Sequence, residues 1–277
     1  MSMNPKITLS VTLTFLLIFF SFHITYSQYL LNNLDNSSAT ASTLPPMPDF
    51  AAIKDIKQRK HAFFDYLTPH IRQQNSKIKA LRRYIQKQNS NKPSTKIKQL
   101  AQQYRLPIND TDLKQSLLTN IDTIPPSLVL AQAAIESAWG TSRFATKGNN
   151  YFGQWCFTAG CGLVPTQRAS GSHHEVRRFA SPEDSIASYM LNLNSHPAYK
   201  QLRTNRLTLR NNNETANGCF LAEGLIKYSE RKTIYVNSLK QLMRTNKLEE
   251  KQSEYCKSNL PAEENTANIR PPLVPQG

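Results

Sequence analysis

Glu136 is the ionisable residue of this chain best placed for acid chemistry, because its neighbours are small or apolar. It follows Ala133–Ile135 and precedes Ser137–Trp139. A carboxyl group held against apolar surface resists ionisation and can act as a general acid near neutral pH. Cleavage of a glycosidic bond needs such an acid. The pattern therefore favours a catalytic carboxyl over the ordinary alternative, a Glu in an exposed ion pair.

A short helix is expected to carry this carboxyl. Pro125–Pro126 suits a first helical turn, and Asp122 or Thr123 is a candidate cap. Gly140 suits a helix end. The apolar residues between them recur at helical intervals: Leu128, Ala131, Ile135 and Trp139. Glu136 then lies in the last turn, where the helix dipole adds to burial in raising its pKa.

Two motifs and two looser stretches give the segment a family resemblance. The motifs are Ala133–Gly140 and Asn149–Gly153, and the looser matches are Tyr189–Tyr199 and Gly224–Ser229. They resemble the glucosaminidase domain of glycoside hydrolase family 73, most closely its Bax-type branch. The resemblance implies a lysozyme-like, mostly α fold (α+β) with a small β-hairpin lobe. It also implies hydrolysis of peptidoglycan at β-1,4 bonds of N-acetylglucosamine, with Glu136 as the catalytic acid.

A second carboxylate is less well marked. Alternation over Leu163–Phe179 predicts two strands around a turn at Ala169–Ser172, and the family resemblance implies an acidic residue in this β-lobe. Glu175 is the candidate that the hairpin offers. Glu183 and Asp184 are interpreted instead as the first turn of the next helix, where acidic residues complement the dipole.

The second group decides the mechanism. Inverting and retaining enzymes both use a second carboxylate, whereas a third route uses the N-acetyl group of the substrate as the nucleophile. Tyr228 could orient that group, as the matching family tyrosine suggests. The alternative for Tyr228 is a buried structural tyrosine with a bonded hydroxyl.

Aromatic residues are the candidates for sugar binding, because the apolar faces of sugar rings stack on aromatic rings. Tyr151, Phe152 and Trp155 follow the acid, and Tyr228 lies farther along the chain. Phe152 is also a candidate core residue, and Trp139 is expected to pack beneath the acid. Trp155 is the best candidate for an exposed platform.

Four cysteines suggest disulfides if the chain is exported, as its N-terminus indicates below. Cys156 and Cys161 would close a tight loop directly after the aromatic motif, and Cys219 and Cys256 are the remaining pair. Neither C-x-x-C nor H-E-x-x-H spacing occurs, so no metal and no cofactor are expected.

The N-terminus indicates export. An apolar run at 7–24 follows Lys6 and contains no acidic residue, which is typical of a secretory signal or an uncleaved membrane anchor. The expected location is the periplasm or cell envelope. The expected divisions are a signal peptide or anchor at 1–27, a flexible linker at 28–48, a basic helical extension at 49–110, a catalytic domain at 111–250 and a flexible tail at 251–277.

Positive charge is concentrated before the catalytic segment. The chain has a net charge of +15, and residues 51–105 hold fourteen Lys or Arg against two Asp. Amphipathic helices with a basic face are expected there. Peptidoglycan, other anionic wall polymers and an anionic membrane surface are the candidate partners, and export argues against nucleic acid. The alternative is a solvated face whose apolar side packs on the rest of the protein. The oligomeric state is left open.

Two other functions fit the same residues. A lytic transglycosylase would also use one acid in a lysozyme-like groove. A non-catalytic wall-binding protein would keep the basic region and the aromatic groove without depending on Glu136.

Overall fold

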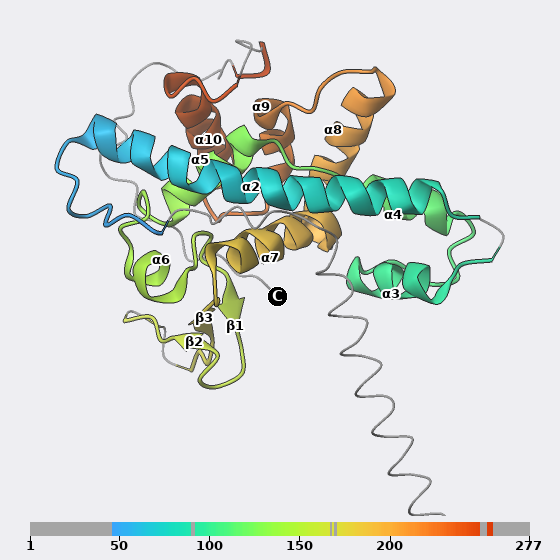
Figure 1. Ribbon diagram of the computed structural model, residues 1–277, viewed down its shortest axis with the longest axis horizontal. Coiled ribbons are helices and arrows are strands. Elements are labelled where there is room, and N and C mark those ends of the chain that lie inside the picture. The colour runs from blue at the N-terminus through green and yellow to red at the C-terminus, as the bar shows by residue number, and fades with distance from the viewer. Residues whose placement is uncertain (1–45, 90–91, 167, 169–170, 250–253, 257–277) are drawn as a thin grey trace, which may run out of the picture. The chain divides into compact units, whose positions relative to one another are not determined.

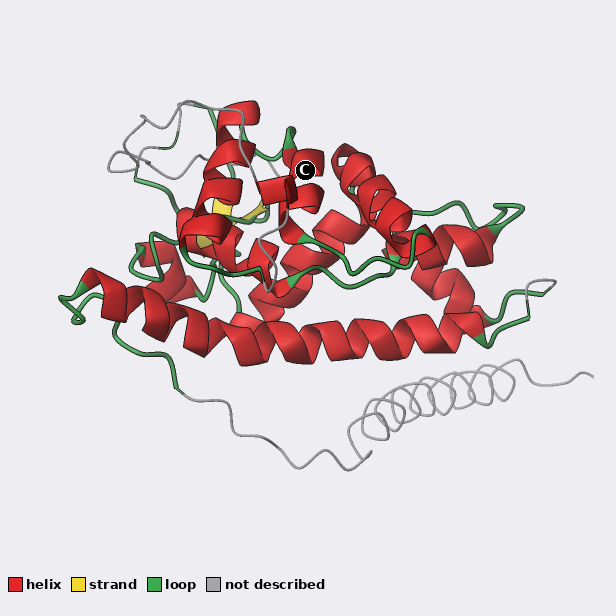
Figure 2. Ribbon diagram, turned by 90° about the horizontal axis from the view of Figure 1, so that it is seen from above, coloured by secondary structure: helices red, strands yellow, loops and turns green. Residues whose placement is uncertain are grey.

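The computed structural model describes residues 46–256 apart from 90–91, 167, 169–170 and 250–253 (Figure 1). Its α-helices are α2 (Ile56–Gln86), α3 (Thr95–Gln103), α4 (Leu113–Asn120), α5 (Pro126–Glu136), α6 (Arg143–Gly148), α7 (Pro182–Ser195), α8 (Lys200–Asn211), α9 (Gly218–Ala222) and α10 (Thr233–Thr245). Its strands are β1 (Trp155–Cys156), β2 (Gly162–Leu163) and β3 (Glu175–Arg177), and its 3₁₀ turns are η1 (Pro197–Tyr199), η2 (Glu223–Leu225) and η3 (Glu254–Cys256). The mostly α, lysozyme-like fold with a small β-lobe is confirmed (Figure 2).

Several predicted segments fall outside this range. The leader at 1–27, most of the linker at 28–48 and most of the tail at 251–277 are not among the described residues. Of the helices that are described, none is both long enough and apolar enough to cross a membrane.

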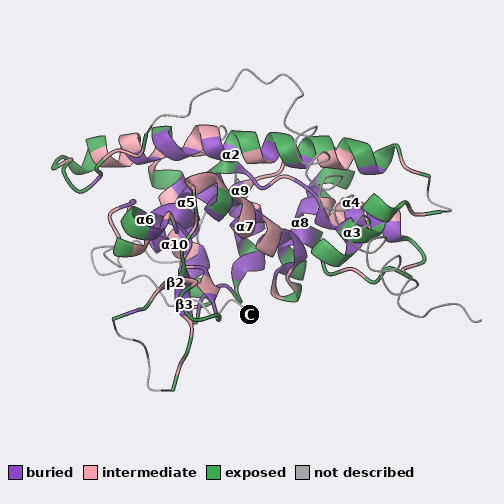
Figure 3. Ribbon diagram, turned by 60° about the horizontal axis from the view of Figure 1, so that its bottom comes forward, coloured by how far each residue is buried: buried purple, intermediate pink, exposed green. Residues whose placement is uncertain are grey.

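Helix α2 packs along one side of the apolar core. Its buried side includes Phe63, Leu67 and Ile71, which share one apolar cluster with α5 and α7. Exposed and buried stretches alternate along it (Figure 3). His70 of α2 also bonds Glu183 in the first turn of α7, with Nδ1 and Oε1 2.6 Å apart. The basic face of α2 is therefore the outer side of a helix whose apolar side packs on the rest of the protein.

Helix α5 runs through the core and ends at Glu136. It begins with Pro126, and no side chain caps it. The predicted cap at Asp122 or Thr123 is therefore wrong. Asp122 instead accepts two hydrogen bonds from Arg210 of α8, at 2.6 and 2.7 Å. A buried carboxylate needs a cationic partner to offset the free-energy cost of burying its charge.

The chain leaves α5 through a left-handed turn. Ala138, Trp139 and Gly140 have φ values of 50°, 60° and 77°. A Cβ at Gly140 would lie 2.5 Å from the ring of Phe50, so only glycine fits against this ring. The side chain of Trp139 packs on α2, with ring centroids 5.9 Å from Phe63 and 5.4 Å from Phe64.

The β-lobe is a three-stranded antiparallel sheet in the order β1-β3-β2. The predicted hairpin corresponds to β2 and β3, whose register pairs Leu163 with Val176. Its predicted turn at 169–172 lies partly outside the described residues. Strand β1 was not predicted, because two residues are too few to show alternation. It pairs Trp155 with Val176 and Cys156 with Glu175.

Two disulfides close loops of different size. Cys156–Cys161 lies in the β-lobe, and Cys219–Cys256 joins α9 to η3. These are the two pairings considered from the sequence, and disulfides are typical of proteins from oxidising compartments.

Candidate active site

Glu136 is a buried acid with one free oxygen. Its exposed fraction is 6%, and the hydroxyl of Tyr235 on α10 donates to its Oε1 at 2.8 Å. Its Oε2 is buried and has no hydrogen-bond partner among the described residues. Burial raises the pKa of Glu136 to about 8, while the Tyr235 hydrogen bond acts in the lowering direction. The carboxyl therefore keeps its proton at neutral pH.

A directional hydrogen-bond chain decides which oxygen holds that proton. The Tyr189 hydroxyl donates to Oε1 of Gln132, and Nε2 of Gln132 donates to the Tyr235 oxygen at 3.0 Å. An amide nitrogen only donates, so the single Tyr235 proton is left for Oε1 of Glu136. With Oε1 accepting, the acidic proton lies on the free Oε2.

Gln132 and Tyr235 were not identified from the sequence. Gln132 lies one helical turn before Glu136 on α5, a spacing that places two side chains on one helix face. That spacing could have revealed it. Tyr235 is 99 residues from Glu136 along the chain, and no local pattern indicates such a contact.

The Asn149–Gly153 motif forms a rigid loop beside the acid. Oδ1 of Asn150 accepts from the backbone N–H groups of Phe152 and Gln154, at 3.2 and 3.1 Å. Its Nδ2 donates to the carbonyls of Gln154 and Arg177, both at 2.9 Å. Gly153 has φ 67°, and a Cβ there would lie 3.9 Å from Oε2 of Glu136. The free side of the acid thus faces a residue without a side chain.

Three of the aromatic candidates are interior residues. Tyr151, Phe152 and Tyr228 each have an exposed fraction of 0%. Phe152 stacks on Tyr189 with centroids 3.9 Å apart, and Tyr228 stacks on Tyr235 at 5.5 Å. The Tyr228 hydroxyl also donates to the carbonyl of Phe152 at 3.3 Å. These rings hold the two tyrosines of the hydrogen-bond chain in place.

Trp155 is the aromatic candidate that reaches the surface. It stacks on His174 with centroids 3.8 Å apart and an interplanar angle of 16°. It lines a hollow of about 490 Å³ together with Arg105, Arg177 and Asn192. Trp155 comes two residues after Gly153 in the chain, and Gln154, between them, also lines the hollow.

Glu175 is bonded within the β-lobe. Its Oε1 accepts from the N–H of Gly160 at 2.9 Å, and its Oε2 accepts from that of Gly162 at 2.7 Å. These two bonds hold the pKa of Glu175 below its usual value. Ligand atoms of Cys156, Cys161 and Glu175 lie within 4.8 Å of one another, but both cysteines are in a disulfide and offer no thiolate. The contacts of Glu175 hold the disulfide loop in shape.

Replacing Cys156 and Cys161 with Ser should clearly lower the rate of hydrolysis but cost little stability, because the bridge closes a short loop directly after Trp155. The pair is five residues apart and the other pair 37 apart. Loop entropy then predicts losses of about 2 kcal/mol for the first pair and about 4 kcal/mol for the Cys219/Cys256 double mutant. Urea unfolding and hydrolysis assays on both double mutants measure this. Full activity without the first bridge would show that it does not shape the site.

Comparison with known proteins assigns the family. Residues 113–248 match the Glucosaminidase family model, described as mannosyl-glycoprotein endo-beta-N-acetylglucosaminidase. Over 211 residues the chain is 33% identical to "Protein bax" of Escherichia coli (strain K12), covering 73% of this chain and 74% of that protein. No solved structure matches. The chain that carries this buried acid therefore belongs to the glucosaminidase family, as a Bax-type member with a glycosidase-type domain.

Proposed function

We propose that this protein is an exported peptidoglycan hydrolase that cleaves β-1,4 bonds at N-acetylglucosamine, with Glu136 as general acid. The observation that carries the proposal is the free Oε2 of a carboxyl whose pKa burial raises to about 8. Such a group holds a proton at neutral pH and has no acceptor for it among the residues that the structure describes. A glycosidic oxygen beside Gly153 would be that acceptor.

The glycan would lie along the hollow that contains Trp155. One face of a sugar ring would stack on the exposed part of the indole, which His174 holds from the other side. Arg105 and Arg177, which line the same hollow and are exposed, would meet carboxylates carried by the wall polymer. Tyr151, Phe152 and Tyr228 would act from the interior, where they hold the Asn149–Gly153 loop and Tyr235 in place.

We propose the substrate-assisted route for the chemical step. Oε2 of Glu136 gives its proton to the glycosidic oxygen as the bond from that oxygen to C1 breaks. The acetamide oxygen of the substrate bonds to C1 in the same step. Water then opens the cyclic intermediate, and the Glu136 carboxylate takes a proton from this water. Glu175 stays the rival second carboxylate, but its two backbone bonds favour a role in the loop.

The mass of fragments released from purified peptidoglycan tests the reaction. A reducing N-acetylglucosamine end supports the proposal, whereas an anhydro-sugar end would indicate the lytic transglycosylase. Binding without release of fragments would indicate the non-catalytic wall protein.

Replacing Tyr235 with Phe should move the basic limb of the pH–rate profile upward. The Tyr235 hydrogen bond stabilises the ionised form of Glu136 and lowers its pKa, so its loss lets the acid stay protonated to higher pH. The expected shift is about one pH unit, or roughly 1.4 kcal/mol. The matched control is Tyr228→Phe, whose ring is also fully buried and stacks on Tyr235. An equal shift in both variants would contradict a specific effect of Tyr235 on the acid.

The export of the chain is proposed on two grounds. Two disulfides need an oxidising compartment to persist, and the apolar run at 7–24 has the composition of a leader or an anchor. The cell envelope is also where peptidoglycan is found.

A further inference from the structure

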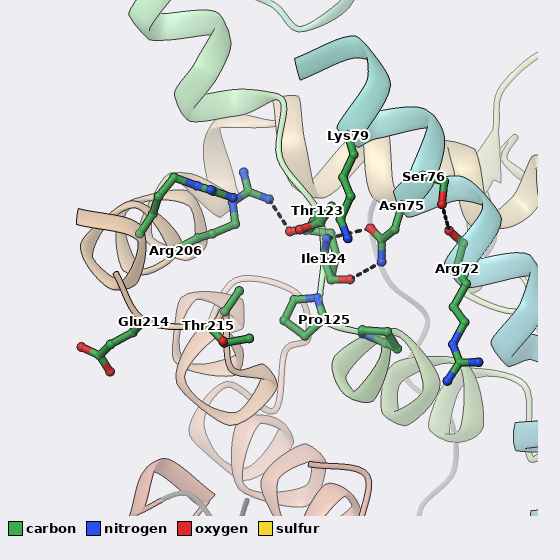
Figure 4. Close-up of a pocket in the computed structure, with 13 residues that line it drawn as sticks. Arg72, Asn75, Ser76, Lys79, Thr123, Ile124, Pro125, Arg206, Glu214 and Thr215 are labelled. Atoms are coloured by element: carbon green, nitrogen blue, oxygen red, sulfur yellow. Dashed lines mark hydrogen bonds between the residues drawn. The ribbon is translucent and has the colours of Figure 1, made fainter. Parts of the chain in front are cut away.

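A second hollow lies at the opposite end of α5 from the acid. It has a volume of about 550 Å³ and is bounded by α2, by the segment from Thr123 to Pro126, and by α8 with the loop after it. Arg72 and Lys79 stand on one side of it, and Arg206 and Thr215 on the other (Figure 4). Glu136 is ten positions after Pro126 on this helix, which corresponds to about 15 Å along its axis. A ligand in this hollow would not occupy the reacting position.

The floor of the hollow, the segment from Thr123 to Pro126, is held in place by hydrogen bonds from side chains of α2 and α8. Asn75 of α2 donates to the carbonyl of Ile124 at 2.8 Å and accepts from its N–H at 3.1 Å. Arg206 donates to the carbonyls of Asp122 and Thr123 at 3.0 and 3.2 Å. The carbonyls of Thr123 and Ile124 are therefore already occupied, and this segment is fixed before any ligand binds.

The charge of the hollow is positive. Arg72 and Lys79 lie seven residues apart, on one face of α2, and both are exposed. Neither side chain makes a hydrogen bond or an ion pair with any residue that the structure describes. The acidic lining residue, Glu214, points away from both cations (Figure 4). Two cations about 10 Å apart along the helix suit a ligand with more than one anionic group.

Apolar groups accompany these cations. Ile124, Pro125 and Ala216 line the same hollow. A phosphodiester polymer would use the cations alone, whereas a peptide with carboxylates and small apolar side chains would use both kinds of surface. We propose that this hollow binds an acidic peptide of the class attached to peptidoglycan strands. The proposal rests on the proposed function only for the choice of polymer.

The test compares two pairs of charge removals on α2. Arg72→Gln/Lys79→Gln changes the hollow, and Lys77→Gln/Arg83→Gln removes the same charge from exposed positions of the same helix that do not line it. Binding is measured in the Glu136→Gln background, so that the wall is not cut. The probes are intact peptidoglycan, glycan stripped of its peptides, and phosphatidylglycerol vesicles. Thermal melting checks that each variant is folded.

The first pair should weaken binding to intact peptidoglycan about tenfold or more, as expected for lost charged hydrogen bonds. It should leave binding to stripped glycan unchanged, and the second pair should change neither. Equal losses for the two pairs, no loss for the first, or a loss on stripped glycan would overturn the proposal. A selective loss confined to vesicles would assign the hollow to a membrane and overturn it also. Failure here would leave the hydrolysis assay with the wild-type protein untouched.

Discussion

Replacing Glu136 with Gln is expected to lower the rate of peptidoglycan hydrolysis by roughly 10²–10⁴-fold. The amide has the shape of the protonated carboxyl and is neutral like it, so the packing of α5 and the contact with Tyr235 should survive. It cannot release a proton to a leaving group. Fragment release from purified peptidoglycan, at equal protein concentration, measures the loss.

The control for this variant is Glu175→Gln, in the β-lobe. An amide there loses one of the two bonds to the Gly160 and Gly162 N–H groups, so a moderate loss through the loop is expected. A loss as large as that of Glu136→Gln would make Glu175 the second catalytic carboxylate. Retention of more than about a tenth of the activity in Glu136→Gln would remove Glu136 from the role of acid.

The Glu136→Gln variant also allows a test that does not depend on activity, which is the pH dependence of the free energy of unfolding. Unfolded Glu136 has its ordinary pKa of 4.5, and burial raises the folded value to about 8. Between these values the native state holds a proton that the unfolded state has lost, so native stability falls as pH rises. Urea unfolding of the wild type relative to Glu136→Gln should show this fall from about pH 4.5 to about pH 8. A constant difference would mean that the pKa is not raised.

Replacing Arg206 with Met should cost about 3–5 kcal/mol of stability. The guanidinium is 2% exposed, and burial lowers its pKa to about 10, so it stays charged at neutral pH. It donates to four backbone carbonyls between Thr119 and Thr123 and to the side chain of Asn194. Methionine would fill the space but remove these five hydrogen bonds. Among the described residues, only the carbonyls of Asp122 and Asn120 would keep a second donor, from Asn194 and from the Asp122 N–H.

Urea unfolding at pH 7 measures this cost, and Lys200→Met is the matched control. Lys200 begins the same helix and is exposed, so its loss should change the free energy of unfolding by less than about 0.5 kcal/mol. Similar losses in the two variants would mean that Arg206 acts as an ordinary surface cation.

The parts of the fold that follow from local chemistry were predicted. The prolines and apolar spacing before Glu136 gave α5, and the alternation before Phe179 gave β3. The first strand of the hairpin was placed too late, because β2 ends at Leu163, where that strand was expected to begin. Burial of Glu136 and the raised pKa follow from its apolar neighbours. Each of these depends on residues close together in the chain.

The parts that depend on distant partners were not predicted. Asp122 has the right position for a helix cap, but Arg210, 88 residues away, binds it instead. Tyr235 reaches Glu136 from α10, and the ring that stacks on it is that of Tyr228, from the segment before α10. Aromatic residues near the acid in sequence could equally be a surface platform or core. Only the structure shows that Trp155 reaches the surface whereas Tyr151 is buried.

The contacts around the end of α5 also decide whether the family segment could be transferred to another gene and still fold. Phe50 and Phe63 cover the turn at Gly140, directly after the acid, and both lie before the family match at 113–248. Recombination that carried only the matching segment into another gene would leave the end of α5 uncovered. The segment that matches the family model is therefore not structurally independent of the residues before it. To keep this packing after recombination, the transferred segment would have to begin at Phe50 or earlier.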